Sequence, residues 1–170
     1  MLRFRVIDIK KDRNLLLEFH CRINYASETP YARKAPYEKY REKWLSTPQP
    51  KSYLSHLAKT MKDERTIAEI LEDDGAVVGY LWVTLEDVEG YGITTASIMD
   101  IIVTPDYQRR GIGLMMLAHA EKLTKERGAA LLRSDTGIEN VASQRLHEKF
   151  GFKPYRIHYE KVLRDVSTSF

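Results

Sequence analysis

The stretch PDYQRRGIG, residues 105–113, places two arginines and two glycines between an apolar run and a helical pattern. A strand that runs into glycines at the start of a helix leaves backbone N–H groups unpaired at the positive end of the helix dipole. Such groups bind phosphate. Gly111 and Gly113 carry no Cβ, so an anion can approach the backbone closely. The loop is therefore a candidate phosphate site, and the alternative is an ordinary helix start with solvated arginines.

Two common nucleotide-binding loops are excluded by the residues around these glycines. A Walker A loop requires Gly-Lys-Ser/Thr, whereas Gly113 is followed by Leu114 and Met115. The dinucleotide-binding fingerprint requires a third glycine, which is missing here. The local pattern thus leaves the anion unidentified.

The first 64 residues contain one strand pattern and three helical segments. Leu2, Phe4 and Val6 alternate with arginines, which is typical of a half-buried strand. Asp12 is placed to cap a helix that ends at Ser27. Two further helices are expected over 36–45 and 52–62.

From residue 66 onward, strand and helix patterns alternate. They predict a hairpin over 66–87, a strand over 94–104, a helix over 112–127, a strand over 129–135, a helix over 140–150 and a last strand over 156–163. The strands from 94 and 129 are expected to be parallel neighbours across a helical crossover. This order predicts a single α+β domain over 1–170, with a mixed, mostly antiparallel central sheet flanked by helices.

Composition limits the classes of partner and compartment. The chain has 170 residues and a net charge of +3, which is mild compared with the concentrated positive charge of nucleic-acid binders. No apolar run approaches the roughly 20 residues that span a bilayer. The single cysteine, Cys21, has no partner within the chain for a disulfide. We expect a cytoplasmic protein with no nucleic acid, membrane or metal partner.

Two motifs resemble one family. QRRGIG resembles the Gln/Arg-x-x-Gly-x-Gly/Ala signature of the GNAT superfamily of acyl-CoA N-acyltransferases, and NVASQRLHEKFGF resembles the family's next helix and the Gly-Phe after it. The resemblance covers residues 98–152, while the first 64 residues match only in their order of elements. It implies the GNAT fold, with splayed parallel strands at the cofactor site. Residues 1–64 would then form the acceptor side and 65–170 the cofactor-binding core.

The resemblance implies that acetyl-CoA is the cosubstrate. Its diphosphate would lie on the backbone N–H groups of 109–114, its pantetheine beside 101–103, and either arginine would contact phosphate or remain solvated. A strand N–H near Val103 is the candidate donor to the oxyanion. The expected cofactor-binding residues are Ile101, Ile102, Val103, Gln108, Arg109, Arg110, Gly111, Ile112, Gly113, Leu114, Asn140 and Ser143.

The implied reaction is direct attack of a primary amine on the thioester in a ternary complex, since Cys21 lies far in sequence from the cofactor motif. Asp100 is the candidate general base. It lies in SIMDIIV, where both strand faces are mostly apolar, so burial would raise the pKa of an unpaired carboxyl. The alternative is a structural acid bonded to an arginine or tyrosine.

His147 is the candidate acid for the leaving thiolate. The family commonly has a tyrosine seven residues after the position of Asn140, and this chain has histidine there. Asn140, Ser143 and His147 share one helical stripe, separate from the apolar stripe, and are expected to face the cofactor. The alternatives are a surface histidine, with water or another group such as Tyr155 as the acid.

The acceptor is expected to be an amine on a small molecule or a peptide, recognised by the helical first half. Candidate contacts in its aromatic-rich connection are Tyr25, Tyr31, Arg33 and Tyr37, for which packing is the alternative. A homodimer is possible. The rival function is a non-catalytic acyl-CoA-binding sensor or interaction module, which the missing tyrosine would favour.

Overall fold

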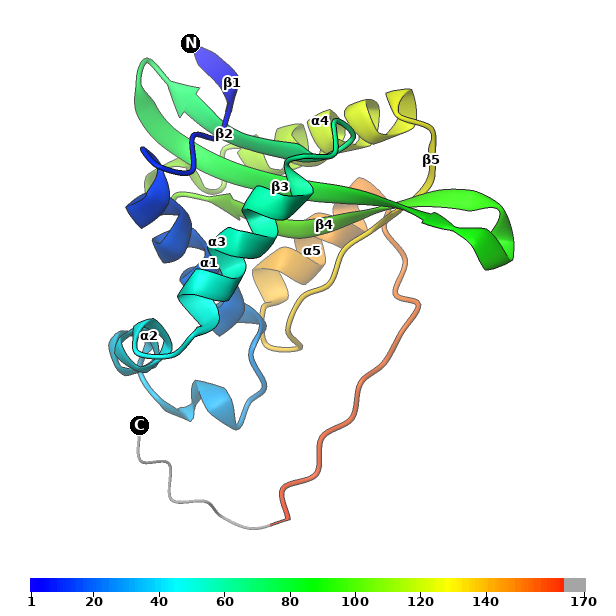
Figure 1. The fold of residues 1–170 in the computed structure, drawn as a ribbon. Coiled ribbons are helices and arrows are strands. Elements are labelled where there is room, and N and C mark those ends of the chain that lie inside the picture. Colours follow the sequence, from blue (N-terminus) through cyan, green and yellow to red (C-terminus); the bar gives the residue numbers. More distant parts are fainter. Residues whose placement is uncertain (164–170) are drawn as a thin grey trace.

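A computed structural model of the protein describes residues 1–163. Within this range one five-stranded sheet lies between two layers of helices, and its strands are in chain order (Figure 1). The first four strands are antiparallel neighbours and the last pair is parallel, so the predicted mixed α+β sheet is confirmed. The strands are β1 (Leu2–Val6), β2 (Ile67–Asp73), β3 (Ala76–Val88), β4 (Ile93–Val103) and β5 (Ala129–Arg133).

The helices cover both faces of this sheet. Two of them, α1 and α3, pack on one face and bury Leu16, Leu57 and Tyr80, whereas α4 and α5 lie behind the other (Figure 1). Among the described residues, no helix is both long enough and apolar enough to cross a bilayer. The helices are α1 (Arg13–Ser27), α2 (Tyr37–Leu45), α3 (Gln49–Thr60), α4 (Ile112–Glu126) and α5 (Val141–Phe150).

The hairpin between β2 and β3 turns where the sequence predicts. Asp73 pairs with Ala76, and the two residues between them, Asp74 and Gly75, have φ of 47° and 86°. Positive φ at both central residues matches the right-handed twist of the flanking strands, and Asp-Gly is a preferred pair there. Local turn chemistry therefore explains this prediction.

A bulge in β4 decides which way Asp100 points. Val83 pairs with Ile98 and Trp82 with Asp100, so Met99 is an extra residue in β4. Side chains alternate along a strand, and one extra residue reverses the alternation beyond it. Ile98 and Ile101 therefore share the α4 face of the sheet, while Asp100 lies on the α1 face.

The parallel strands β4 and β5 separate partway along β4. Their pairing ends at Ser97 with Arg133, whereas β4 continues to Val103 with only β3 beside it. The backbone of β4 beyond Ser97 thus has an open edge toward β5. This agrees with the splayed strands that the family resemblance implies.

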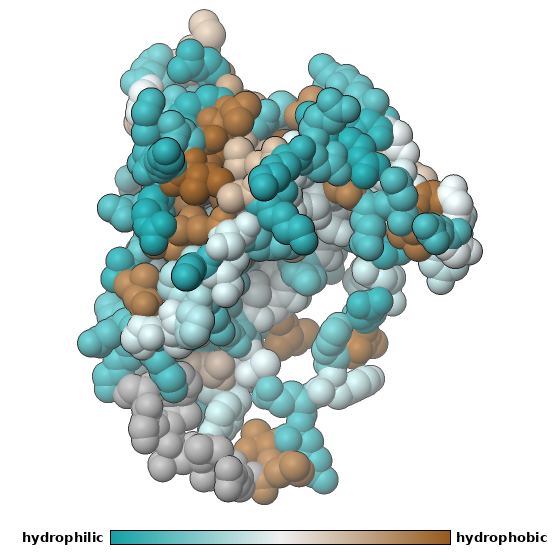
Figure 2. All heavy atoms as spheres, viewed as in Figure 1, coloured by the Kyte–Doolittle hydropathy of each residue, from teal (hydrophilic) through white to brown (hydrophobic). Residues whose placement is uncertain are grey.

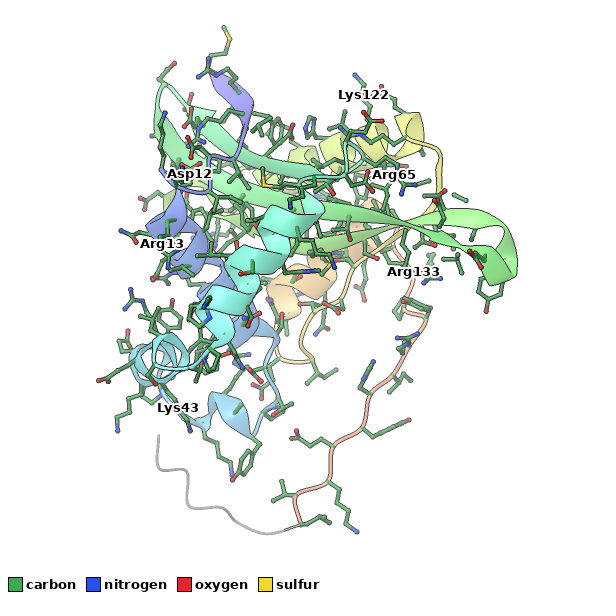
Figure 3. All side chains as sticks on the ribbon, in the orientation of Figure 1. Asp12, Arg13, Lys43, Arg65, Lys122 and Arg133 are labelled. Carbon is green, nitrogen blue, oxygen red and sulfur yellow. The ribbon has the colours of Figure 1, made fainter. Side chains whose placement is uncertain are left out.

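Asp12 precedes α1 as predicted, but its side chain does not cap the helix. The carboxylate instead accepts hydrogen bonds from both terminal nitrogens of Arg5, at 2.8 and 2.9 Å, and from the Asp8 amide at 2.9 Å. Arg5 also donates to Glu72 on β2 at 2.6 Å. Through its ion pair with Arg5 of β1, Asp12 therefore connects the start of α1 at Arg13 to the sheet (Figure 3).

The predicted last strand over 156–163 is wrong. Residues 153–163 form no strand, are exposed throughout, and run away from the sheet (Figure 1). Hydrophobic residues, coloured brown in Figure 2, lie along this exposed segment. Ile157 and Leu163 are 75% and 86% exposed. Alternation favours a strand, but a strand forms only by pairing with another edge. Here the segment pairs with none of the described strands.

We expect Asp12→Asn to lower the free energy of unfolding by about 2 kcal/mol near pH 7, because hydrogen bonds to charged groups contribute about that much. Arg5 holds the pKa of Asp12 below its usual value. The stabilisation is therefore complete above the ordinary aspartate pKa of about 3.9 and is lost as the pH falls through the lowered folded value.

Urea denaturation from pH 7 down to pH 2 measures this difference. Asp106→Asn, at an exposed position in the short 3-10 helix Pro105–Tyr107, is the control and should change stability little. A gap between wild type and Asp12→Asn that stays constant over this range would contradict the ion pair's role.

Candidate active site

The loop before α4 has the backbone of an anion site. Arg109 and Gly111 both have left-handed φ, of 60° and 81°. The Met115 amide donates to the Gly111 carbonyl at 3.1 Å, which is the first intrahelical bond. The amides of residues 112–114 precede that bond, so they point out of the helix end. These donors lie at the positive end of the α4 dipole, where an anion is stabilised.

Glycine is required at positions 111 and 113 for two different structural reasons. A Cβ at Gly111 would meet no atom within 4 Å, so its left-handed φ is what requires glycine. A Cβ at Gly113 would come within 3.0 Å of Leu146 on α5. Gly113 thus permits close packing of α4 against the helix that carries His147, a reason the sequence did not show.

The polar side chains of the loop belong to residues that precede the start of α4. Gln108 donates its amide to the carbonyl of Val103 at 2.9 Å and so ties the loop to the end of β4. The guanidinium of Arg110 lies 5.3 Å from the centre of the Tyr107 ring. Arg109 and Arg110 are exposed. Gln108 therefore positions the loop, and the arginines place positive charge beside it.

The three β4 residues predicted beside the cofactor offer backbone rather than side chains. Ile101 and Val103 pack into the core under α4, and Ile102 packs into the core under α1 and α3. Their strand has its open edge here, since β5 has already separated. Any ligand beside this edge would meet N–H and C=O groups.

Asp100 is buried and paired with a histidine from α1. It is 2% exposed, and its oxygens lie 2.8 and 3.1 Å from Nδ1 of His20. Burial raises the pKa of the Asp100 carboxyl, and hydrogen bonds from His20 and Tyr80 oppose that rise. The main partner is thus an imidazole, where the sequence suggested arginine or tyrosine.

The His20 ring is held in one orientation. It stacks on Tyr53 with ring centres 3.8 Å apart, and the Tyr53 hydroxyl lies 3.0 Å from that of Tyr80. With Nδ1–H donated to Asp100, the lone pair of the neutral ring is on Nε2. His20 is therefore arranged to accept a proton at Nε2 while a carboxylate stabilises the charged ring.

His20 opens onto a pocket of about 400 Å³ between the sheet and the helices α1, α2 and α3. The bulged Met99 of β4 forms part of its wall. The indole N–H of Trp44 is buried and has no hydrogen-bond partner among the described residues. The lining residues are His20, Asn24, Trp44, Gln49, Ser52, Tyr53, His56, Trp82 and Met99.

The sequence reasoning missed this pocket, although α3 carries a signal for it. Gln49, Ser52, Tyr53 and His56 recur at spacings of three and four and so share one helical face. That face combines polar and aromatic side chains. A helix face buried in the core would be mostly apolar, and a solvated face would have no need of aromatic rings. Its link to His20 was invisible because α1 and α3 meet only in the tertiary structure.

The predicted acceptor contacts Tyr25, Tyr31, Arg33 and Tyr37 lie outside this lining. The Tyr25 hydroxyl donates to the Ala35 carbonyl at 2.8 Å, and both Tyr25 and Tyr37 pack around Cys21 and Trp44. Arg33 pairs with Glu139 at 3.4 Å. Their contacts are those of packing and surface ion pairs, which was the alternative interpretation.

His147 is buried, so the interpretation as a surface histidine is wrong. Its Nδ1 lies 2.7 Å from the Ser143 carbonyl, to which it donates, and its Nε2 lies 2.8 Å from the Ser134 hydroxyl. Ser134 directly follows the last residue of β5. The ring therefore faces the separation of β4 and β5 through Ser134.

Asn140 and Ser143, predicted to bind the cofactor, organise the start of α5. The Asn140 side chain accepts the Ser143 amide at 3.2 Å as an N-cap. Tyr155, the alternative acid, is 62% exposed and lies against Arg133 at the end of β5 (Figure 3). It is thus placed on the surface of the segment after α5.

Comparison with known proteins identifies the family. The acetyltransferase (GNAT) family model matches residues 27–152. An aminoglycoside N(6')-acetyltransferase type 1 from Serratia marcescens is 34% identical over 53% of this chain and 65% of its own length. The [ribosomal protein bS18]-alanine N-acetyltransferase of Escherichia coli K12 is 39% identical over 34% of this chain and 38% of its own.

The match therefore spans less than two thirds of either relative. Among solved structures, a predicted acetyltransferase from Clostridium acetobutylicum with acetyl-CoA has a TM-score of 0.69 at 18% identity, over 96% of this chain and 97% of that one. This likeness shows the fold. Since the family model covers most of the described residues, the chain belongs to the acetyltransferase (GNAT) family.

Proposed function

We propose that the protein transfers an acetyl group from acetyl-CoA to a primary amine by direct attack in a ternary complex. The observation that carries this is the oriented His20–Asp100 pair, which opens onto a pocket beside the strand whose far end leads into the anion loop. A base, an acceptor pocket and a phosphate site thus meet along β4. A non-catalytic sensor of acyl-CoA would have no need of the pair.

The residues present fit acetyl-CoA. A diphosphate needs several N–H donors, which the helix end at 112–114 supplies, and the positive φ of Gly111 aims the backbone there. The pantetheine carries amides, which can pair with the open edge of β4 beyond Ser97. When bound, the cosubstrate supplies an acetyl group activated as a thioester.

His20 takes the role of base, with Asp100 as its positioning residue. An alkylamine has a pKa near 10.4, so neutralising it at pH 7 costs roughly 4 to 5 kcal/mol. Asp100 is 2% exposed and lies behind the imidazole, so a substrate proton reaches His20 first. Nε2 accepts that proton, and the Asp100 carboxylate stabilises the resulting imidazolium.

His147 acts as acid through Ser134. A protonated ring donates Nε2–H to the Ser134 oxygen, which frees the Ser134 hydroxyl proton for the departing thiolate. As Ser134 gives up its proton it takes one from His147, so the ring returns to its neutral form. This arrangement keeps the histidine buried and still delivers a proton where β4 and β5 separate.

We expect Gly111→Asp to weaken acetyl-CoA binding at least tenfold, because it strains a left-handed residue and adds a negative charge beside the diphosphate. Isothermal titration calorimetry measures the affinity. Gly128→Asp is a matched control, since Gly128 has φ of 82°, equally open surroundings and a place at the other end of α4. Equal losses in both variants would refute the anion site.

We expect His20→Gln to lower kcat by about 10²- to 10⁴-fold with little change in acetyl-CoA affinity, as is typical for loss of a general base. A higher pH should restore part of the rate, because more of the amine is then neutral. His56→Gln, in the same pocket but without a carboxylate partner among residues 1–163, should change KM more than kcat. The same loss of kcat in both variants would remove His20 from the chemistry.

If His147 acts through Ser134, Ser134→Ala and His147→Phe should lower kcat by similar factors, and the double variant should be no slower than either. A single-turnover assay that follows thiolate release measures this step. Multiplicative losses in the double variant would show that the two residues act independently.

A further inference from the structure

The pocket beside His20 is walled by aromatic rings. The Tyr53 and Trp82 ring centres are 6.0 Å apart, and those of His56 and Trp82 are 5.3 Å apart. The His20 ring lies 6.0 Å from that of Trp44, which closes the opposite side. Aromatic faces attract a single cation and pack well against a flat apolar group.

Negative charge is scarce in this pocket. None of its nine lining residues is Asp or Glu. Asp100 contacts the lining through His20, and its carboxylate is buried and hydrogen-bonded to that ring. An acceptor with several ammonium groups would leave its further charges without carboxylate partners, which disfavours its binding.

Resting on the proposed acetyl transfer, we infer that the acceptor is an arylalkylamine, with one amine and one aromatic ring. The amine lies near Nε2 of His20, and the ring packs among Tyr53 and Trp82. A volume of about 400 Å³ suits a molecule of this size.

Tryptophan fluorescence reads this pocket directly, because Trp44 and Trp82 are the two tryptophans of the chain and both line it. With coenzyme A present, titration with tyramine should give a saturable change in emission. Spermidine and kanamycin, which carry several ammonium groups, should give little change. Thiol release from acetyl-CoA with the same three amines measures turnover.

The outcomes separate the pocket from the reaction. Binding and preferred turnover of tyramine support both, whereas tyramine binding with no turnover of any amine keeps the pocket assignment and refutes acetyl transfer. A higher kcat/KM for spermidine or kanamycin leaves acetyl transfer standing and overturns the acceptor class. An unchanged emission with tyramine also overturns it.

Discussion

A buried carboxylate without a partner would be costly, and the contact that prevents this organises the centre of the molecule. Asp100 lies on β4 with 2% exposure, and hydrogen bonds from His20 and Tyr80 stabilise its charge. This contact joins α1 to β4 and fixes the imidazole against Tyr53. The floor of the pocket and the direction of Nε2 both depend on it.

Strand β4 divides the chemistry between the two sides of the sheet. Its bulge at Met99 turns Asp100 toward α1, while Ile98 and Ile101 remain in the core under α4. Beyond Ser97 the departure of β5 leaves an edge of free backbone, and the strand then leads into the loop at the N-terminus of α4. In the proposed reaction, this one strand would present the cosubstrate along its edge and the acceptor on its face.

Features set by neighbouring residues were predicted well. The Asp74-Gly75 turn, the loop before α4 and the helix that ends at Gly151 depend on local backbone preference and periodicity, and all three are present. Two predictions that needed a particular distant partner failed, although the parallel pairing of β4 with β5 is present as predicted. The segment 156–163 lacks a strand to pair with, and the Asp12 carboxylate bonds to Arg5 in place of the helix end.

The sequence by itself determined the α+β order of elements, the family motif and the positions of Asp100 and His147, because these depend on spacing along the chain. Only the tertiary structure decided what those side chains contact. An unpredicted bulge reversed the strand alternation at Asp100, and packing of α1 and α3 on the sheet brought His20 and Tyr53 beside it. Both effects depend on contacts between residues far apart in sequence, so no local sequence pattern predicts them.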